Sequence, residues 1–236
     1  MTWESICGSF GRVTIVQPQR CVVIGGGGHS SVIIDLIMES EVVEPAGILD
    51  RNRMLSQSHV LGVPIIGGDD YLKKLSEEGI TCFIVGLGST GNTTARERLY
   101  KQATDAGLKA ITLVHPSAYV SKHANIGPGS VVLAMAVVST RATLGKNVII
   151  NSGSIIEHGC QIGDHVHVAT GAKLAGDIRV GNGVHIGAGA VLKEGIKIGS
   201  EAIIGAGSAV INDIKPKMTV FGVPAGPANA TNRTQK

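Results

Sequence analysis

Histidines gather in the middle of this 236-residue chain, where four of its eight lie between residues 158 and 185. An imidazole has an unperturbed pKa of about 6.5, so near neutral pH much of it is unprotonated and can take a proton from a nucleophile. His158 lies eighteen residues before Gly176, and His167 lies eighteen residues before His185. If positions at this spacing meet in space, His158 faces a residue whose bare backbone N–H is open to a ligand. The pattern predicts a general base beside a donor for a developing oxyanion.

A repeat of six residues explains why that spacing matters. An unbroken period of six is typical of a parallel β-helix, in which each hexad forms one short side and three hexads complete a triangular coil. Residues eighteen apart then lie above one another at a separation of about 4.8 Å. The inward aliphatic positions are Val120, Ile126, Val132, Val138, Leu144, Ile150, Ile156, Ile162, Val168, Leu174, Val180, Ile186, Leu192, Ile198, Ile204 and Val210.

Before the repeat, strand and helix patterns alternate, as in a small doubly wound parallel sheet. The apolar run Cys21–Ile24 leads into Gly25–Gly28, and a helical pattern follows with Val32, Ile33, Leu36 and Ile37 on one face. Further strands are expected at 46–49, 63–66, 82–85 and 110–114, with helices over 69–78 and 93–106. A glycine turn between a strand and a helix can hold phosphate on backbone N–H groups. The glycine spacing disfavours classical NAD binding; a nucleotide-sugar site and a purely structural turn both remain open.

Composition excludes several other classes of protein. A formal net charge of +3, with no cluster of basic and aromatic residues, argues against nucleic acid as a partner. The four cysteines (Cys7, Cys21, Cys82 and Cys160) form no C-x-x-C pair, which favours buried free thiols in a reducing compartment. The sequence shows neither a signal peptide nor a membrane-length apolar run, so we expect a cytoplasmic protein without membrane insertion.

Several short segments together resemble one family of transferases. Residues 149–158 read Ile-Ile-Asn-Ser-Gly-Ser-Ile-Ile-Glu-His, and the likeness continues through residues 162–176. His115–Ala118, the pair Gly28-His29 and Gly222–Ala225 fit as well. The chain thereby resembles, over about residues 21–226, the hexapeptide-repeat family of sialic-acid O-acetyltransferases and nucleotide-aminosugar N-acetyltransferases, including PglD-like and perosamine enzymes.

The resemblance implies a fold and an assembly. It implies an α/β, Rossmann-like parallel sheet followed by a left-handed parallel β-helix, which assembles as a homotrimer with active sites between subunits. The expected domains are an unassigned N-terminal extension (1–20), a nucleotide-sugar-binding domain (21–115), an acetyltransferase domain (116–226) and a polar tail (227–236).

The resemblance also implies roles for individual residues. It makes His158 the general base, with His167 and Asn151 as further active-site groups. Acetyl-CoA, the co-substrate, would contact His167, Gly176, Gly205, Val223 and Pro224, and the nucleotide sugar would contact Gly28, His29 and Asp50.

One position departs from the family pattern. Members usually have an acidic residue directly after the base, where this chain has Gly159. Glu157 precedes His158, but successive strand residues face opposite ways, so it is not expected to substitute. Asp164 or a carboxylate from another subunit is the expected replacement.

The sequence thus predicts an acetyl-CoA-dependent N-acetyltransferase of a nucleotide-linked amino sugar, such as a UDP-4-amino-4,6-dideoxy sugar. The alternatives are O-acetylation of sialic acid or another hydroxyl acceptor, and a non-catalytic nucleotide-sugar sensor or scaffold. A metal site is also conceivable, because hexapeptide-repeat carbonic anhydrases share this architecture. His167 and His185 would supply only two ligands, and no third histidine has the required spacing, so no metal is expected.

Overall fold

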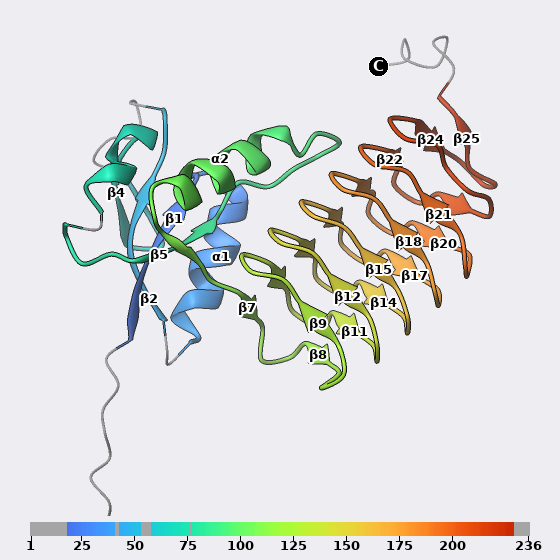
Figure 1. The fold of residues 1–236 in the computed structure, drawn as a ribbon, viewed down its shortest axis with the longest axis horizontal. Helices are drawn as coiled ribbons and strands as arrows, with labels where there is room; N and C mark the ends of the chain where they lie inside the picture. The colour runs from blue at the N-terminus through green and yellow to red at the C-terminus, as the bar shows by residue number, and fades with distance from the viewer. Residues whose placement is uncertain (1–17, 41–42, 53–57, 76, 229–236) are drawn as a thin grey trace, which may run out of the picture.

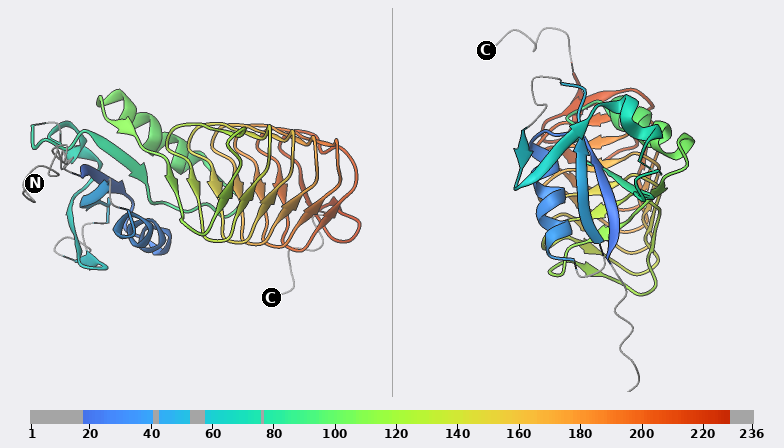
Figure 2. Two further views of the ribbon diagram at one scale, coloured as in Figure 1. Left: turned by 90° about the horizontal axis from the view of Figure 1, so that it is seen from below. Right: turned by 90° about the vertical axis from the view of Figure 1, so that its left-hand side faces the viewer.

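The structure, a computed structural model, describes residues 18–40, 43–52, 58–75 and 77–228 of the chain. An α/β domain and a solenoid of stacked coils lie end to end (Figure 1). The coils follow one another in a continuous stack away from the α/β domain (Figure 2). Cys7, most of the expected N-terminal extension and most of the expected polar tail lie outside the described residues.

The α/β domain is built on a six-stranded sheet with the order β3-β4-β2-β1-β5-β6. Only the pairing of β3 with β4 is antiparallel. Strand β1 lies between β2 and β5, so the chain turns to opposite sides of β1, and the ends of these strands form the switch point where doubly wound sheets bind ligands. The strands are β1 (Gln19–Ile24), β2 (Val43–Leu49), β3 (His59–Val60), β4 (Val63–Gly67), β5 (Cys82–Val85) and β6 (Lys109–Ala110).

Two α-helices cover this sheet, α1 (Gly28–Met38) and α2 (Thr94–Asp105). Of the four residues predicted to share one face of α1, Ile33, Leu36 and Ile37 are buried, whereas Val32 is 42% exposed and Ile34 is buried in its place. The predicted helix over 69–78 is a short 3-10 helix, Asp69–Lys73, tightened by bonds from Tyr71 N–H to Gly68 and from Lys74 N–H to Tyr71. No helix within the described part of the chain is long and apolar enough to span a membrane.

The solenoid has three faces of parallel strands, closed at one end by an antiparallel pair. The first face contains β7 (Leu113–Val114), β10 (Val131–Val132), β13 (Ile149–Ile150), β16 (His167–Val168), β19 (His185–Ile186), β22 (Ile203–Ile204), β24 (Thr219–Phe221) and β25 (Gly226–Pro227). The second contains β8 (Tyr119–Val120), β11 (Val137–Val138), β14 (Ile155–Ile156), β17 (Lys173–Leu174), β20 (Val191–Leu192) and β23 (Ala209–Val210). The third contains β9 (Asn125–Ile126), β12 (Thr143–Leu144), β15 (Gln161–Ile162), β18 (Arg179–Val180) and β21 (Lys197–Ile198).

The predicted repeat is confirmed in register and in direction. From β7 to β23, parallel neighbours lie eighteen residues apart, as Val132 pairs with Ile150 and His167 with His185. In the last coil the offset is sixteen residues, since Ile203 of β22 pairs with Thr219 of β24. In the strands from β10 to β23 the second residue points inward, and from Val132 to Val210 all of these aliphatic side chains lie in one buried core. The first two, Val120 and Ile126, are only partly buried because they belong to the first coil.

Glycines after the third-face strands let neighbouring coils touch. A Cβ on Gly163 would lie 2.4 Å from Asn182 Oδ1 and 2.8 Å from the carbonyl carbon of Gly181. A Cβ on Gly181 would lie 2.6 Å from the amide nitrogen of Ser200. The close approach of stacked backbones therefore requires glycine at these positions.

The two parts share one hydrophobic core, because α1 packs against the first face of the solenoid. Ile33 and Ile37 of α1 belong to the same buried cluster as Val131, Leu133 and Ile149. The segment predicted as one strand, 110–114, is divided: β6 ends the α/β sheet, whereas β7 pairs with β10 of the solenoid. The predicted domain limits at residues 20, 115 and 226 stay predictions.

Candidate active site

His158 lies at the corner between the second and third faces, after β14 and before β15. Its ring covers Gly176 of the next coil, since a Cβ on Gly176 would lie 2.5 Å from Cε1 and 2.7 Å from Nε2 of the imidazole. Within the described residues the amide N–H of Gly176 donates to no acceptor. The corner thus places a partly exposed base beside an unused hydrogen-bond donor.

Glu157, Asp164 and Asp177 differ in what their carboxylates contact. Asp164, one of the expected substitutes, accepts a hydrogen bond from Lys146 N–H at 3.0 Å and lies 3.6 Å from Lys146 Nζ. Its carboxylate therefore contacts Lys146 and not His158. Glu157 accepts the backbone N–H of His158 at 3.2 Å rather than its ring. Asp177 places Oδ2 4.0 Å from Nδ1 of His158. The prediction for Asp164 is therefore wrong, and Asp177 is the carboxylate beside the imidazole.

His167 lies on β16 of the first face and is buried against the α/β domain. Its Nδ1 is 2.5 Å from the carbonyl oxygen of Ser89, which can only accept, so Nδ1 carries the proton. Its Nε2 is 3.4 Å from the side-chain amide of Asn151. Burial lowers the pKa of His167 to about 4, outweighing the bond to Ser89. This imidazole is therefore neutral at physiological pH and presents Nε2 as an acceptor.

Two further imidazoles stand near His167 with unsatisfied nitrogen atoms. Nε2 of His29 and Nδ1 of His185 are buried and have no hydrogen-bond partner among the described residues. Burial, with smaller contributions from Arg96 and His167, lowers the pKa of His29 to about 3. Burial also lowers the pKa of His185. A buried polar atom without a hydrogen bond costs free energy, so a bound ligand that forms a hydrogen bond with Nε2 of His29 would remove this cost.

The residues expected to contact acetyl-CoA separate into two places. Gly205 lies three coils beyond the active-site candidate Asn151, in one column along the corner between the first and second faces, and Val223 follows β24. At the end of this column Gly205 packs against Phe221, and the Val223-Pro224 segment is exposed. Gly176 lies with His158 at the next corner. One chain therefore does not bring all the predicted residues together.

The expected nucleotide-sugar residues lie at the carboxyl ends of β1 and β2. A cavity of about 220 Å³ there is lined by Gly25, Asp50, Arg51, Asn52 and Arg98, among others. Asp50 accepts the N–H of Gly26 at 2.6 Å and that of Asn52 at 2.8 Å, so its carboxylate shapes the glycine turn. Gly28 begins α1, where backbone N–H groups point outward. His29, in the first turn, faces the junction with the solenoid instead.

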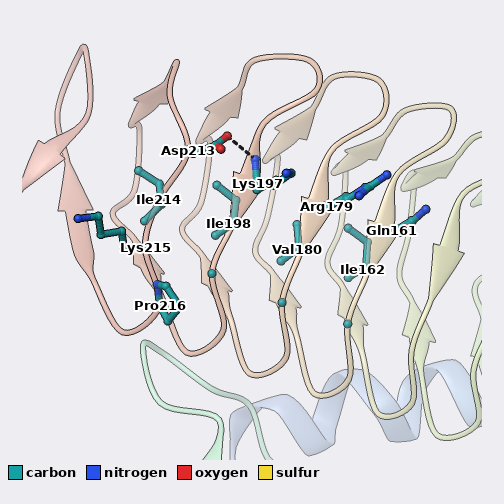
Figure 3. A pocket seen from close by; sticks show the side chains of 13 residues that line it. Gln161, Ile162, Arg179, Val180, Lys197, Ile198, Asp213, Ile214, Lys215 and Pro216 are labelled. Carbon is teal, nitrogen blue, oxygen red and sulfur yellow. Dashed lines mark hydrogen bonds between the residues drawn. The ribbon is translucent and has the colours of Figure 1, made fainter.

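A larger groove of about 590 Å³ runs along the third face, where its floor is formed by glycines and aliphatic side chains. Arg179, Lys197 and Lys215 line it, and Asp213 accepts the backbone N–H of Lys197 at 2.8 Å (Figure 3). None of the predicted site residues lines this groove, so the size of a cavity alone does not identify the active site. Its lining carries three cationic side chains and one carboxylate.

No metal centre is formed within the ranges that the structure describes: no three His, Cys, Asp or Glu side chains converge there as ligands. His167 and His185 stack edge to face with ring centroids 5.0 Å apart.

Comparisons with known proteins match both parts of the fold. Residues 20–103 match the PglD N-terminal domain, and residues 141–176 and 177–212 match the bacterial transferase hexapeptide model of six repeats. Fold and site together therefore define a hexapeptide-repeat transferase with a PglD-type N-terminal domain.

Similar solved structures narrow this class. A variant of perosamine N-acetyltransferase from Caulobacter crescentus, in complex with CoA and GDP-perosamine, is 33% identical, covers 89% of this chain and 96% of that chain, and gives a TM-score of 0.84. The acetyltransferase domain of PglB from Neisseria gonorrhoeae FA1090, in complex with acetyl coenzyme A, is 36% identical over 89% of this chain and 100% of that chain, with a TM-score of 0.82.

A curated relative is UDP-N-acetylbacillosamine N-acetyltransferase from Bacillus subtilis (strain 168), 36% identical over 121 residues. That alignment spans 49% of this chain and 52% of the relative, about half its length. The chain belongs to the hexapeptide-repeat family of sugar N-acetyltransferases that these proteins represent. The predicted family, enzyme class and left-handed β-helix fold are confirmed.

Sequence reasoning missed several residues of these sites. Asp177 follows Gly159 by eighteen, so the same stacking rule that paired His158 with Gly176 would have found it. Ser89, Arg51 and Arg98 carry no such signal, because the folding of the α/β domain brings them to His167 and to Asp50.

Proposed function

We propose that this protein transfers an acetyl group from acetyl-CoA to the amine of a nucleotide-linked amino sugar, in particular a UDP-4-amino-4,6-dideoxy sugar. The observation that carries the proposal is the His158 ring lying over Gly176, with the amide N–H of Gly176 unused. A base and an oxyanion donor at one corner are what aminolysis of a thioester requires.

The reaction needs no covalent enzyme intermediate. The neutral amine attacks the thioester carbonyl carbon, the oxyanion is stabilised by the N–H of Gly176, and His158 takes the proton from the amine nitrogen. The C–S bond then breaks, and the imidazolium returns the proton to the departing sulfur. Amide and free CoA thiol are the products, so atoms and charges balance. Positioning of the amine beside the thioester supplies much of the rate.

The α/β domain supplies the nucleotide-sugar site of this proposal. The cavity at Asp50 offers Arg51 and Arg98 to phosphates, and the start of α1 at Gly28 offers N–H groups. The imidazole of His29, whose Nε2 is unpaired, interacts electrostatically with His167 of the solenoid. A nucleotide held by Asp50 would direct its sugar toward this junction.

The two groups of site residues fit an active site shared between subunits of a homotrimer. The second face of the solenoid separates the corner of His158 from the corner of Asn151. Its outward column is apolar except for Lys173, with Tyr119 62% exposed and Val191 50% exposed. Three copies that turn this face toward a common axis would bring the His158 corner of one chain beside the Asn151 corner of its neighbour.

The compartment proposed for this activity is the cytoplasm, where acetyl-CoA and nucleotide sugars are available. Cys21, Cys82 and Cys160 are buried free thiols, as expected of a protein that folds under reducing conditions.

Acetyl transfer is tested by following free thiol release from acetyl-CoA with UDP- and GDP-linked amino sugars. We expect turnover with an amino sugar, and a His158→Ala variant whose kcat is lower by about a hundredfold or more while the KM for acetyl-CoA changes little. Faster turnover with a hydroxyl acceptor, or a nucleotide sugar that raises the Tm without any thiol release, would overturn the proposal. Near-normal kcat in His158→Ala would remove His158 from the mechanism.

A further inference from the structure

The side chain of Asp177 fills the space beside Gly159, the residue that follows His158. Gly159 has a positive φ of 70°, and a Cβ built there would lie 2.0 Å from Oδ1 of Asp177. Asp177 also has a positive φ, 58°, at the equivalent point of the next coil, and its backbone N–H donates to the carbonyl of His158 at 2.9 Å. The two corners are therefore held together, and the absence of a side chain at residue 159 admits the carboxylate.

The carboxylate faces the imidazole and is not used elsewhere. Oδ2 of Asp177 lies 4.0 Å from Nδ1 of His158, and in the part of the chain that the structure describes it has no other ion pair or hydrogen bond. The side chains of His158 and Asp177 are 49% and 68% exposed, so both can rotate. A small rotation about the Asp177 side chain would turn this ion-pair distance into a hydrogen bond from Nδ1–H.

A hydrogen bond from Nδ1–H to Asp177 would determine the protonation of Nε2, on the other side of the ring. Nε2 and Cε1 are the imidazole atoms nearest to Gly176. A proton held on Nδ1 by Asp177 leaves the lone pair on Nε2, at the edge of the ring that covers the oxyanion donor. An imidazole with the opposite tautomer would present N–H there and could not act as a base.

We propose that Asp177 is a positioning residue that fixes the Nδ1–H tautomer of His158, using the space left by Gly159. The expected effect of Asp177 on kcat rests on the proposed function. The tautomer of His158 does not depend on that function and can be tested without it. It assigns to this chain a carboxylate from the following coil rather than from the residue next to the base.

The tautomer can be read without any turnover. In ¹⁵N-labelled protein, the ring nitrogens of His158 should report a protonated Nδ1 and an unprotonated Nε2 at neutral pH. In Asp177→Asn, which tolerates the same positive φ, the resonances should move toward the Nε2–H tautomer. An Nε2–H tautomer in the unsubstituted protein would overturn the proposal, whether or not the protein transfers acetyl groups.

Steady-state kinetics test whether Asp177 contributes to catalysis. We expect Asp177→Asn to lower kcat about tenfold, with the KM for acetyl-CoA and the Tm nearly unchanged. The matched control is Glu201→Gln, another corner carboxylate with a positive φ, 60°, and 63% exposure, which pairs with Lys217 and should leave kcat unchanged. Equal kcat in Asp177→Asn and in the control would contradict the proposal.

A swap of the two positions distinguishes positioning from general damage to the corner. Asp177→Gly should lose activity, and Asp177→Gly combined with Gly159→Asp should recover part of it. The combined change returns a carboxylate to the same place and removes the clash with Asp177. No recovery in the folded double variant would overturn the proposal. An active unsubstituted protein with unaffected variants refutes only this inference, whereas an inactive unsubstituted protein refutes the proposed function.

Discussion

Four histidines close to the junction between the two domains are partly or fully buried, and burial favours their neutral form. Burial lowers the pKa of His29 to about 3 and that of His167 to about 4, and also lowers the pKa of His165 and of His185. In the unfolded chain each has a pKa of about 6.5, so below that pH the unfolded state binds more protons than the folded state. Their contribution to the free energy of unfolding is therefore complete above pH 6.5 and is lost as the pH falls toward 4.

The Tm should accordingly fall between pH 7.5 and pH 5, and His167→Gln should make that fall shallower. Each such histidine contributes at most about 1.4 kcal/mol per pH unit in this range. Thermal unfolding at pH 7.5, 6 and 5 measures the slope. His59→Gln is the control, because His59 is exposed on β3. The same pH slope in His167→Gln and in the unsubstituted protein would show that His167 is not held neutral.

At the scale of elements, the buried guanidinium group of Arg96 joins helix α2 to the solenoid. Arg96 is 1% exposed and donates to the carbonyl oxygens of Val85 and Leu87 and to Oδ1 of Asn147, the last at 2.7 Å. Asn147, at a corner of the solenoid, donates in turn to His165. Burial lowers the pKa of Arg96 to about 9, which still leaves it charged at neutral pH. These contacts hold the loop of Ser89, and so His167, in place.

Replacement of Arg96 by Met should lower the free energy of unfolding by about 3 kcal/mol, because several buried acceptors lose their donor at once. Arg98→Met, on the same helix, should cost about 1 kcal/mol or less, since Arg98 is 37% exposed and pairs with Asp69 near the surface. Urea unfolding compares the two variants. Equal stabilities would mean that the contacts of Arg96 do not fasten the helix.

The elements differ in how far the sequence could predict them. The six-residue period locates each strand from β8 to β23 because every inward position is an aliphatic that the core requires. The helix predicted over 69–78 failed because local apolar spacing does not reveal that the segment is tightened by bonds three residues apart. Val32 failed for another reason: the buried stripe of α1 is centred on Ser30, Ile33, Ile34 and Ile37, and the helical period places Val32 away from that stripe.

At the scale of the whole molecule, the predicted site is divided between two corners of the prism. His158, Gly176 and Asp177 share one corner, whereas Asn151 and Gly205 follow another, with His167 on the adjoining face. Spacing alone predicted which residues stack, since eighteen residues make one coil. It could not predict that His167 turns toward Ser89, because that contact joins residues 78 apart in the sequence.

The proposed activity depends on a site completed by two chains. The most direct test co-expresses His158→Ala and His167→Ala chains with different tags and isolates mixed oligomers that carry both. In a mixed trimer, one interface in three joins an intact His158 to a neighbour's intact His167, so we predict about one third of the unsubstituted activity. Each variant alone should be nearly inactive. Mixed oligomers no more active than the separate variants would contradict a site shared between subunits.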